Sequence, residues 1–125
     1  MPRTQCKPSA GPGEQFDFSL ALARLDGDTG LLRQQMESFL QDVPGVLADV
    51  RTSVVRCEAE ALRFAAHRLK GLAAALDAER VAECAAKLES MGRDGALHET
   101  AAACGELEGH VATLQEALKA YVANP

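Results

Sequence analysis

The stretch RFAAHRLKGLAAAL, residues 63–76, decides the fold because its apolar residues recur every three or four positions. That spacing predicts an α-helix with one buried face. The predicted face comprises Leu62, Ala65, Ala66, Leu69, Leu72, Ala73 and Leu76. Gly71 is unexpected there, since a glycine in a helix interior costs about 1 kcal/mol relative to alanine. We therefore expect a reason other than core packing for this glycine.

The sequence on both sides of this stretch continues the helical pattern. Aromatic residues make up 4% of the chain and apolar residues 47%, a composition that favours closely packed helices over a β-sandwich. Periodicity predicts a short helix within residues 16–25 and longer helices over residues 29–56, 58–76, 78–91 and 96–122. Because the connections are very short, consecutive helices must be near-antiparallel neighbours. The predicted fold is all-α: an antiparallel up-down four-helix bundle with a short extra N-terminal helix.

Three local signals refine these helices. Asp28 is expected to cap the helix that follows it, and Asp77 to end one helix and cap the next or to adopt a left-handed conformation. Pro44 lies inside the pattern of residues 29–56 and is expected to kink that helix or split it in two. The sequence GRDG, residues 92–95, is expected to form the turn after the helix over residues 78–91.

The chain ends and the charge limit the classes of function. Residues 1–14 hold three of the five prolines, which predicts a disordered leader or linker before a single domain over residues 15–125. The chain has no run of eighteen apolar residues and no signal-peptide core, so we expect a cytoplasmic protein without membrane contact. The net charge of −5 gives no support for nucleic-acid binding.

The four cysteines, Cys6, Cys57, Cys84 and Cys104, form no CxxC pair and so do not predict a metal site. Without an export signal, we expect reduced thiols, with the last three acting as small buried apolar side chains. A cofactor-binding bundle would need inward-facing ligands, but Met36 stands alone in the predicted core and no ExxH pair occurs. His98 and His110 are expected to face solvent. We therefore expect no metal and no cofactor in this chain.

The outward face of the helix over residues 58–76 carries the candidate chemistry. Successive helical residues lie about 100° apart, so His67 is about 200° from Leu69 and points away from the core. Further residues are predicted to share or border this face: Arg63, Arg68, Lys70, Gly71 and Ala74. An exposed imidazole is largely neutral near pH 7 and offers one nitrogen as a nucleophile. Lys70 could stabilise a phosphoryl group arriving there, and Gly71 would let another protein approach. The alternative is an ordinary surface histidine beside a solvated lysine.

At these residues the chain resembles the histidine-containing phosphotransfer (HPt) domain of bacterial multistep phosphorelays. The family pattern AHxLKG stands here as AHRLKG, residues 66–71, and the likeness extends over residues 16–50 and 79–97. The chain departs from the family at Leu72, commonly a small polar residue, and at Asp77, commonly a glycine.

The resemblance implies that His67 accepts a phosphoryl group from the aspartate of one receiver domain and passes it to another. Lys70 would lie beside the phosphohistidine, and Gly71, with Arg63, Arg68 and Ala74, would form the surface for the receiver. Mg²⁺ is expected only in the receiver. The chain would then be a monomeric phosphocarrier without an ATP or metal site rather than an enzyme. The rival hypothesis is a helical interaction module that docks on a receiver or another protein and carries no phosphate.

Overall fold

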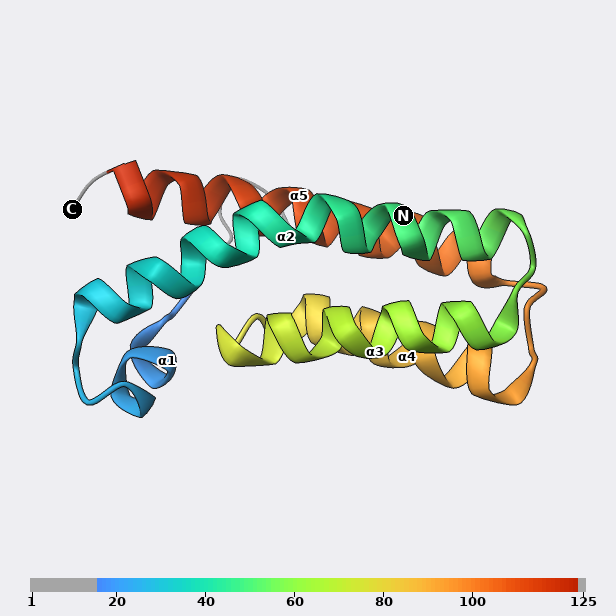
Figure 1. The fold of residues 1–125 in the computed structure, drawn as a ribbon, viewed down its shortest axis with the longest axis horizontal. Helices are drawn as coiled ribbons and strands as arrows, with labels where there is room; N and C mark the ends of the chain where they lie inside the picture. Colours follow the sequence, from blue (N-terminus) through green and yellow to red (C-terminus); the bar gives the residue numbers. More distant parts are fainter. Residues whose placement is uncertain (1–15, 124–125) are drawn as a thin grey trace, which may run out of the picture.

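The computed structural model describes residues 16–123 and contains five α-helices in that range (Figure 1). They are α1 (Ser19–Arg24), α2 (Thr29–Val55), α3 (Ala59–Ala75), α4 (Glu79–Asp94) and α5 (Thr100–Ala123). The described residues contain no β-strand, so the predicted all-α class is confirmed. The predicted leader, residues 1–14, lies outside the described residues, and its boundary stays a prediction.

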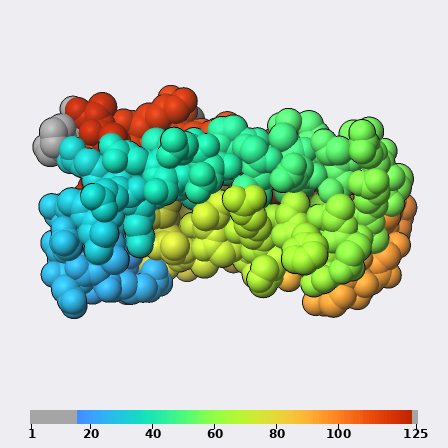
Figure 2. Space-filling model, in the orientation of Figure 1, coloured from blue at the N-terminus to red at the C-terminus, as the bar shows by residue number. Residues whose placement is uncertain are grey.

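The four long helices lie lengthwise beside one another, and α1 lies next to the beginning of α2 (Figure 1). Along the chain they alternate in direction, as short connections require. Helix α3 packs against α2 and α4, and α5 packs against the same two helices, so the four form a closed bundle. The face shown in Figure 2 is built by α1, α2 and α3 together.

The interior of the bundle is mostly aliphatic, with side chains from all four long helices. The largest fully buried side chains are Leu32, Met36, Val43, Val46, Val50, Leu62, Leu69, Leu76, Leu88, Leu107, Leu114 and Leu118. One position of the predicted apolar face differs. Leu72 is only half-buried because it lines a shallow groove between α2 and α3.

Pro44 does not split the second helix. Helix α2 runs without interruption from Thr29 to Val55, and its ribbon changes direction only gently along the way (Figure 1). Proline removes one backbone hydrogen bond from a helix interior. Val43 and Val46, on either side of it, are both fully buried in the same core. We attribute the continuity of the helix to this packing. Of the two predicted alternatives, the split is wrong, whereas a bend in a continuous helix agrees with the course of α2 (Figure 1).

The turns confirm one predicted cap and correct another. The Asp28 carboxylate accepts a hydrogen bond from the Leu31 backbone N–H at 3.0 Å, which confirms the cap of α2. Asp77 adopts the left-handed conformation at φ +55°, but its carboxylate accepts a bond from the Arg24 guanidinium at 2.6 Å. The residue before α4 is Ala78, whose position receives no side-chain cap from the described residues. The predicted Asp77 cap is therefore wrong, because Asp77 lies one residue before the N-cap position of α4. The alternative prediction, a left-handed conformation, is confirmed.

The end of α4 also differs from its prediction. The helix continues through Gly92 to Asp94 and stops at Gly95, which has the left-handed φ of +69° typical of a helix C-terminus. The expected GRDG turn is therefore mostly the last turn of α4. Only its final glycine has the conformation of a helix-ending residue.

The cysteines occupy three different environments. Cys104 is buried and Cys84 half-buried, and burial raises the pKa of both thiols above the ordinary value. Cys57 is exposed in the turn between α2 and α3 with φ +54°, so its predicted burial is wrong. Cys6 lies outside the described residues.

The two other histidines also differ from each other. His98 is exposed, as predicted. His110 is half-buried, and its Nδ1 is buried without a hydrogen-bond partner among residues 16–123, so the prediction that it faces solvent is wrong. None of the described helices is long and apolar enough to cross a membrane.

Candidate functional site

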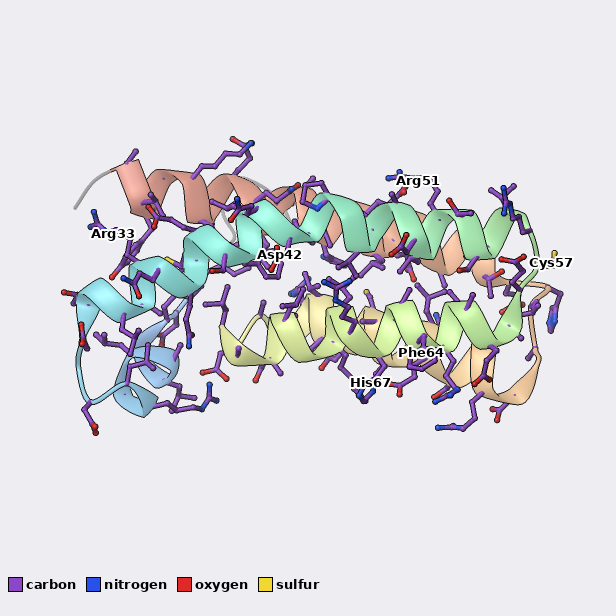
Figure 3. The ribbon with its side chains drawn as sticks, in the orientation of Figure 1. Arg33, Asp42, Arg51, Cys57, Phe64 and His67 are labelled. Carbon is purple, nitrogen blue, oxygen red and sulfur yellow. The ribbon has the colours of Figure 1, made fainter. Side chains whose placement is uncertain are left out.

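The site centres on His67, in the middle of α3. Its side chain is 64% exposed and points away from the bundle interior (Figure 3). The neighbouring positions Ala66 and Leu69 are fully buried, so the core fixes the rotation of the helix about its axis. That rotation places the imidazole on the outside of a rigid helix.

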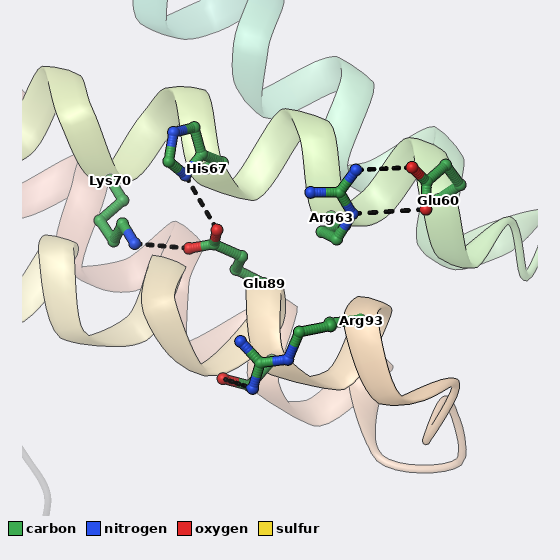
Figure 4. A network of polar contacts seen from close by, with 7 residues as sticks. Glu60, Arg63, His67, Lys70, Glu89 and Arg93 are labelled. Atoms are coloured by element: carbon green, nitrogen blue, oxygen red, sulfur yellow. Dashed lines mark hydrogen bonds and ion pairs between the residues drawn. The ribbon is translucent and has the colours of Figure 1, made fainter.

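A carboxylate from the next helix contacts both His67 and Lys70. Glu89 Oε2 of α4 lies 2.9 Å from His67 Nδ1, and Glu89 Oε1 lies 2.7 Å from Lys70 Nζ (Figure 4). The Glu89 side chain is only 15% exposed. The hydrogen bond from Lys70 lowers the pKa of the Glu89 carboxyl below its ordinary value. Desolvation opposes this effect, and the His67 contact adds to it. Glu89 is therefore ionised near pH 7.

An ionised Glu89 determines which nitrogen of His67 carries the proton. A carboxylate can only accept hydrogen bonds, so Nδ1 must be the protonated donor. In the neutral imidazole, Nε2 then keeps its lone pair. Figure 4 shows the other ring nitrogen of His67 on the side turned away from Glu89. The arrangement thus presents a nucleophilic nitrogen outward and holds the opposite one against α4.

The predicted clearance residues lie on the same exposed side of α3. Gly71 and Ala74 are both exposed. Apart from the backbone of its own helix, no atom of residues 16–123 would lie within 4 Å of a Cβ added at Gly71. The surface beyond His67 toward the C-terminal end of α3 therefore has no bulky side chain at Gly71 or Ala74 and is open to a partner.

The two predicted arginines differ in their surroundings. Arg68 is exposed. Arg63 is half-buried, its Nη2 lies 2.6 Å from Glu60 Oε2, and its guanidinium carbon lies 5.4 Å from the centre of the Phe64 ring. The structure thus holds Arg63 in an ion pair and a cation–π contact, while Arg68 lines the same groove as His67.

A groove between α2 and α3 adjoins His67 on the side opposite Glu89. Its volume is about 670 Å³, and its lining includes Phe64, Ala61, Ala65 and His67. Phe64 is 67% exposed, which is unusual for so large an apolar side chain. Arg68 of α3 and Asp49 of α2 contribute charge to its lining. An exposed aromatic side chain beside a nucleophile is typical of a surface that another protein covers.

Sequence reasoning missed two residues of this site, Glu89 and Phe64. Phe64 could have been found, because its position three residues before His67 lies outside the predicted apolar face. Glu89 could not, since its contact with α3 depends on how two helices align. Within residues 16–123, no group of three or more histidine, cysteine, aspartate or glutamate side chains is arranged to hold a metal ion.

Comparison with known proteins finds one family. A family model described as "Hpt domain" matches residues 34–118, a range that includes all of α3 and α4 and most of α2 and α5. No curated protein and no solved structure matches the chain.

Proposed function

The chain belongs to the Hpt domain family, and from this membership we propose that it is a histidine phosphotransfer protein of a two-component phosphorelay. It accepts a phosphoryl group on His67 from the aspartate of one receiver domain and passes that group to another receiver. The observation that carries this proposal is an exposed imidazole whose Nδ1 is held by Glu89 and whose Nε2 is turned outward.

The transfer step follows from this arrangement. The Nε2 lone pair attacks the phosphorus of the aspartyl phosphate, an N–P bond forms, and the P–O bond to the aspartate breaks to release its carboxylate. The Nδ1 proton stays on the ring, so the imidazole becomes positively charged. Glu89, which accepts the hydrogen bond from Nδ1, stabilises that charge. The reverse step returns the phosphoryl group to a second receiver.

Lys70 supplies the positive charge on the phosphoryl side. Its ammonium is 2.7 Å from Glu89 in the free protein, and its side chain is 37% exposed. A lysine side chain has several rotatable bonds, so Lys70 can turn from Glu89 toward the oxygens of an arriving phosphoryl group. Glu89 keeps the ammonium close to His67 until the partner docks.

The receiver must cover the surface around His67. A typical specific interface takes about 800 Å² from each partner, so the contact extends well beyond His67, and we place Gly71, Ala74 and the groove with Phe64 within it. Gly71 and Ala74 leave room for the partner backbone, and Phe64 offers an apolar anchor. Arg68 supplies positive charge at the rim, which suits the acidic surroundings of a phosphorylated aspartate, and Arg63, paired with Glu60, borders the same surface.

The chain's own contribution is limited to a nucleophile and its surroundings. It acts as a monomeric phosphocarrier in the cytoplasm and contacts neither membrane nor nucleic acid. Mg²⁺ and the aspartate belong to the receiver, and no cofactor or ATP site is needed here.

Transfer from a receiver charged with acetyl [³²P]phosphate tests the proposal. We expect wild type and the matched control His98→Gln, which alters another exposed histidine, to become labelled, and His67→Gln to remain unlabelled. The receivers of the source organism are tested one by one, which also identifies the cognate partners.

The rival function, a docking module without phosphate, predicts a different result. In that case a receiver binds wild type and His67→Gln equally, and no receiver labels either. Equal labelling of His67→Gln and wild type would place the reactive residue elsewhere.

A further inference from the structure

Gly92 occupies the tightest contact between α3 and α4. It is buried in the last turn of α4. A Cβ added to it would lie 2.8 Å from the Ala59 carbonyl oxygen, 2.8 Å from the Arg63 backbone nitrogen and 3.1 Å from the Arg63 Cα. All three atoms belong to the backbone of α3, so no side-chain rotation can relieve the contact. Only a glycine allows the two helices to approach this closely.

This contact lies one helical turn from the candidate site. Glu89 precedes Gly92 by three residues on α4, and His67 follows Arg63 by four residues on α3. Residues three or four apart lie on the same face of a helix. The two helices run in opposite directions (Figure 1), so one turn along both leads from the Gly92 contact to the pair of Glu89 and His67.

We propose that Gly92 is a positioning residue for phosphotransfer, because the close approach it allows sets the separation across which Glu89 reaches His67 and Lys70. The effect on the reaction rate rests on the proposed function, whereas the effect on His67 itself does not. A side chain at position 92 pushes the two backbones apart by several tenths of an ångström. The bonds of 2.9 Å and 2.7 Å to Glu89 then lengthen toward the limit of hydrogen bonding.

Gly92 therefore influences the reaction indirectly, through the position of Glu89. Interactions that stabilise developing charge must be held to within about half an ångström of their productive geometry. Glu89 stands on a helix, and the distance between that helix and α3 is set by the residue that separates their backbones. Gly92 contacts neither the imidazole nor an arriving phosphoryl group.

The first test reads the state of His67 without any phosphate. Long-range ¹H–¹⁵N spectra distinguish the Nδ1–H from the Nε2–H tautomer of an imidazole. We expect wild type to be predominantly Nδ1–H, and Gly92→Ala to shift toward the mixture seen in Glu89→Ala. Gly109→Ala, in α5, is the matched control, since a Cβ there meets no atom of the described residues within 4 Å apart from the backbone of its own helix. A Gly92→Ala spectrum identical to that of wild type would overturn the proposal.

The second test asks whether Gly92 acts through Glu89. Gly92→Ala is expected to slow transfer from a phosphorylated receiver about fivefold to tenfold, as partial loss of a charge-assisted hydrogen bond predicts. The variant that combines Gly92→Ala with Glu89→Ala should be no slower than Glu89→Ala alone. If the rate loss of the double variant equals the product of the two single losses, Gly92 affects transfer independently of Glu89, which would contradict the proposal.

A stabilised variant of the protein controls for a loss of stability in Gly92→Ala. Gly105→Ala and Gly109→Ala, both in open space on α5, raise helix propensity far from the site. Gly92→Ala is measured in that background if it unfolds on its own, with the same expected tautomer shift. If the tautomer shifts and no receiver phosphorylates wild type, the effect of Gly92 on His67 through Glu89 stands and the proposed function fails. If wild type is phosphorylated and the tautomer is unchanged, the positioning role fails alone.

Discussion

Gly71 and Gly92 lie on facing helices, each within about a turn of the residues that meet at His67, yet they serve opposite purposes. A Cβ at Gly71 would meet no atom of residues 16–123 beyond its own helix backbone within 4 Å, whereas one at Gly92 would collide with the α3 backbone at 2.8 Å. Both glycines weaken their helices by about 1 kcal/mol relative to alanine. The first leaves space outside the molecule for a partner, and the second leaves space inside it for a helix. The same residue type thus serves docking in one place and packing in the other.

Leucine at each position should have opposite effects on stability, which is the largest expected effect. Gly92→Leu forces a bulky side chain against backbone atoms and should lower the free energy of unfolding by about 3 kcal/mol, the upper end for overpacking. Gly71→Leu should leave it unchanged or raise it by up to about 0.8 kcal/mol through helix propensity. Urea unfolding followed by circular dichroism measures both. Equal losses in the two variants would remove the distinction between the glycines.

The effect of Gly71→Leu should appear in the reaction instead. The leucine side chain stands where the receiver must approach, and a clash of about 1.4 kcal/mol slows transfer tenfold. The rate of phosphoryl transfer from a charged receiver measures this effect, with Gly105→Ala as a control for a helical glycine far from the site. A rate equal to that of wild type would show that the open surface at Gly71 is not used.

Lys70→Ala should affect phosphoryl transfer, like a change at Gly71, without the loss of stability expected from a change at Gly92. We expect transfer to slow about tenfold, or the phosphohistidine to decay faster, because a positive charge beside the phosphoryl group is lost. The midpoint of thermal unfolding should change little, since the Lys70 side chain is 37% exposed. Lys87→Ala, which removes an exposed lysine of α4, is the matched control. A large drop in the melting temperature would instead make Lys70 a structural residue.

The smallest expected effect is the contribution of Glu89 to stability at acidic pH. The pKa of Glu89 is lowered in the folded protein, chiefly by the hydrogen bond from Lys70, so its ionisation stabilises the fold above about pH 4.5. That contribution is lost as the pH falls through the lower pKa of the folded state. Wild type should therefore lose more stability on acidification than Glu89→Gln, by less than about 1 kcal/mol. Glu83→Gln, at an exposed position of α4, should follow wild type. Identical acid unfolding of wild type and Glu89→Gln would mean that the contacts of Glu89 do not persist in solution.

Much of the fold could be predicted from local periodicity. The helix positions, the Asp28 cap and the outward face with His67 all depend on residues close together in the sequence. Pro44 and Asp77 were harder, because their outcomes depend on distant groups. Valines on both sides of Pro44 are buried in the same core, and the Asp77 carboxylate pairs with Arg24 from another helix.

The same limit applies to the candidate site. Its exposed half, with His67, Lys70 and Gly71, lies on one helix and follows from a 100° rotation per residue. Its other half depends on how α4 aligns with α3. That alignment brings Glu89 to His67 and Gly92 to the α3 backbone, and one helix's pattern cannot reveal it. A glycine in a helix interior indicates a special role, but only the structure shows whether that role is close helix packing, as at Gly92, or an open surface, as at Gly71.

The decisive measurement is the identity of the nitrogen that carries the phosphoryl group. Wild type labelled uniformly with ¹⁵N is phosphorylated by its receiver, and long-range ¹H–¹⁵N and ³¹P spectra then assign the N–P bond. We predict phosphorus on Nε2 of His67 and a proton retained on Nδ1 beside Glu89. Phosphorus on Nδ1, or on any residue other than His67, would contradict it.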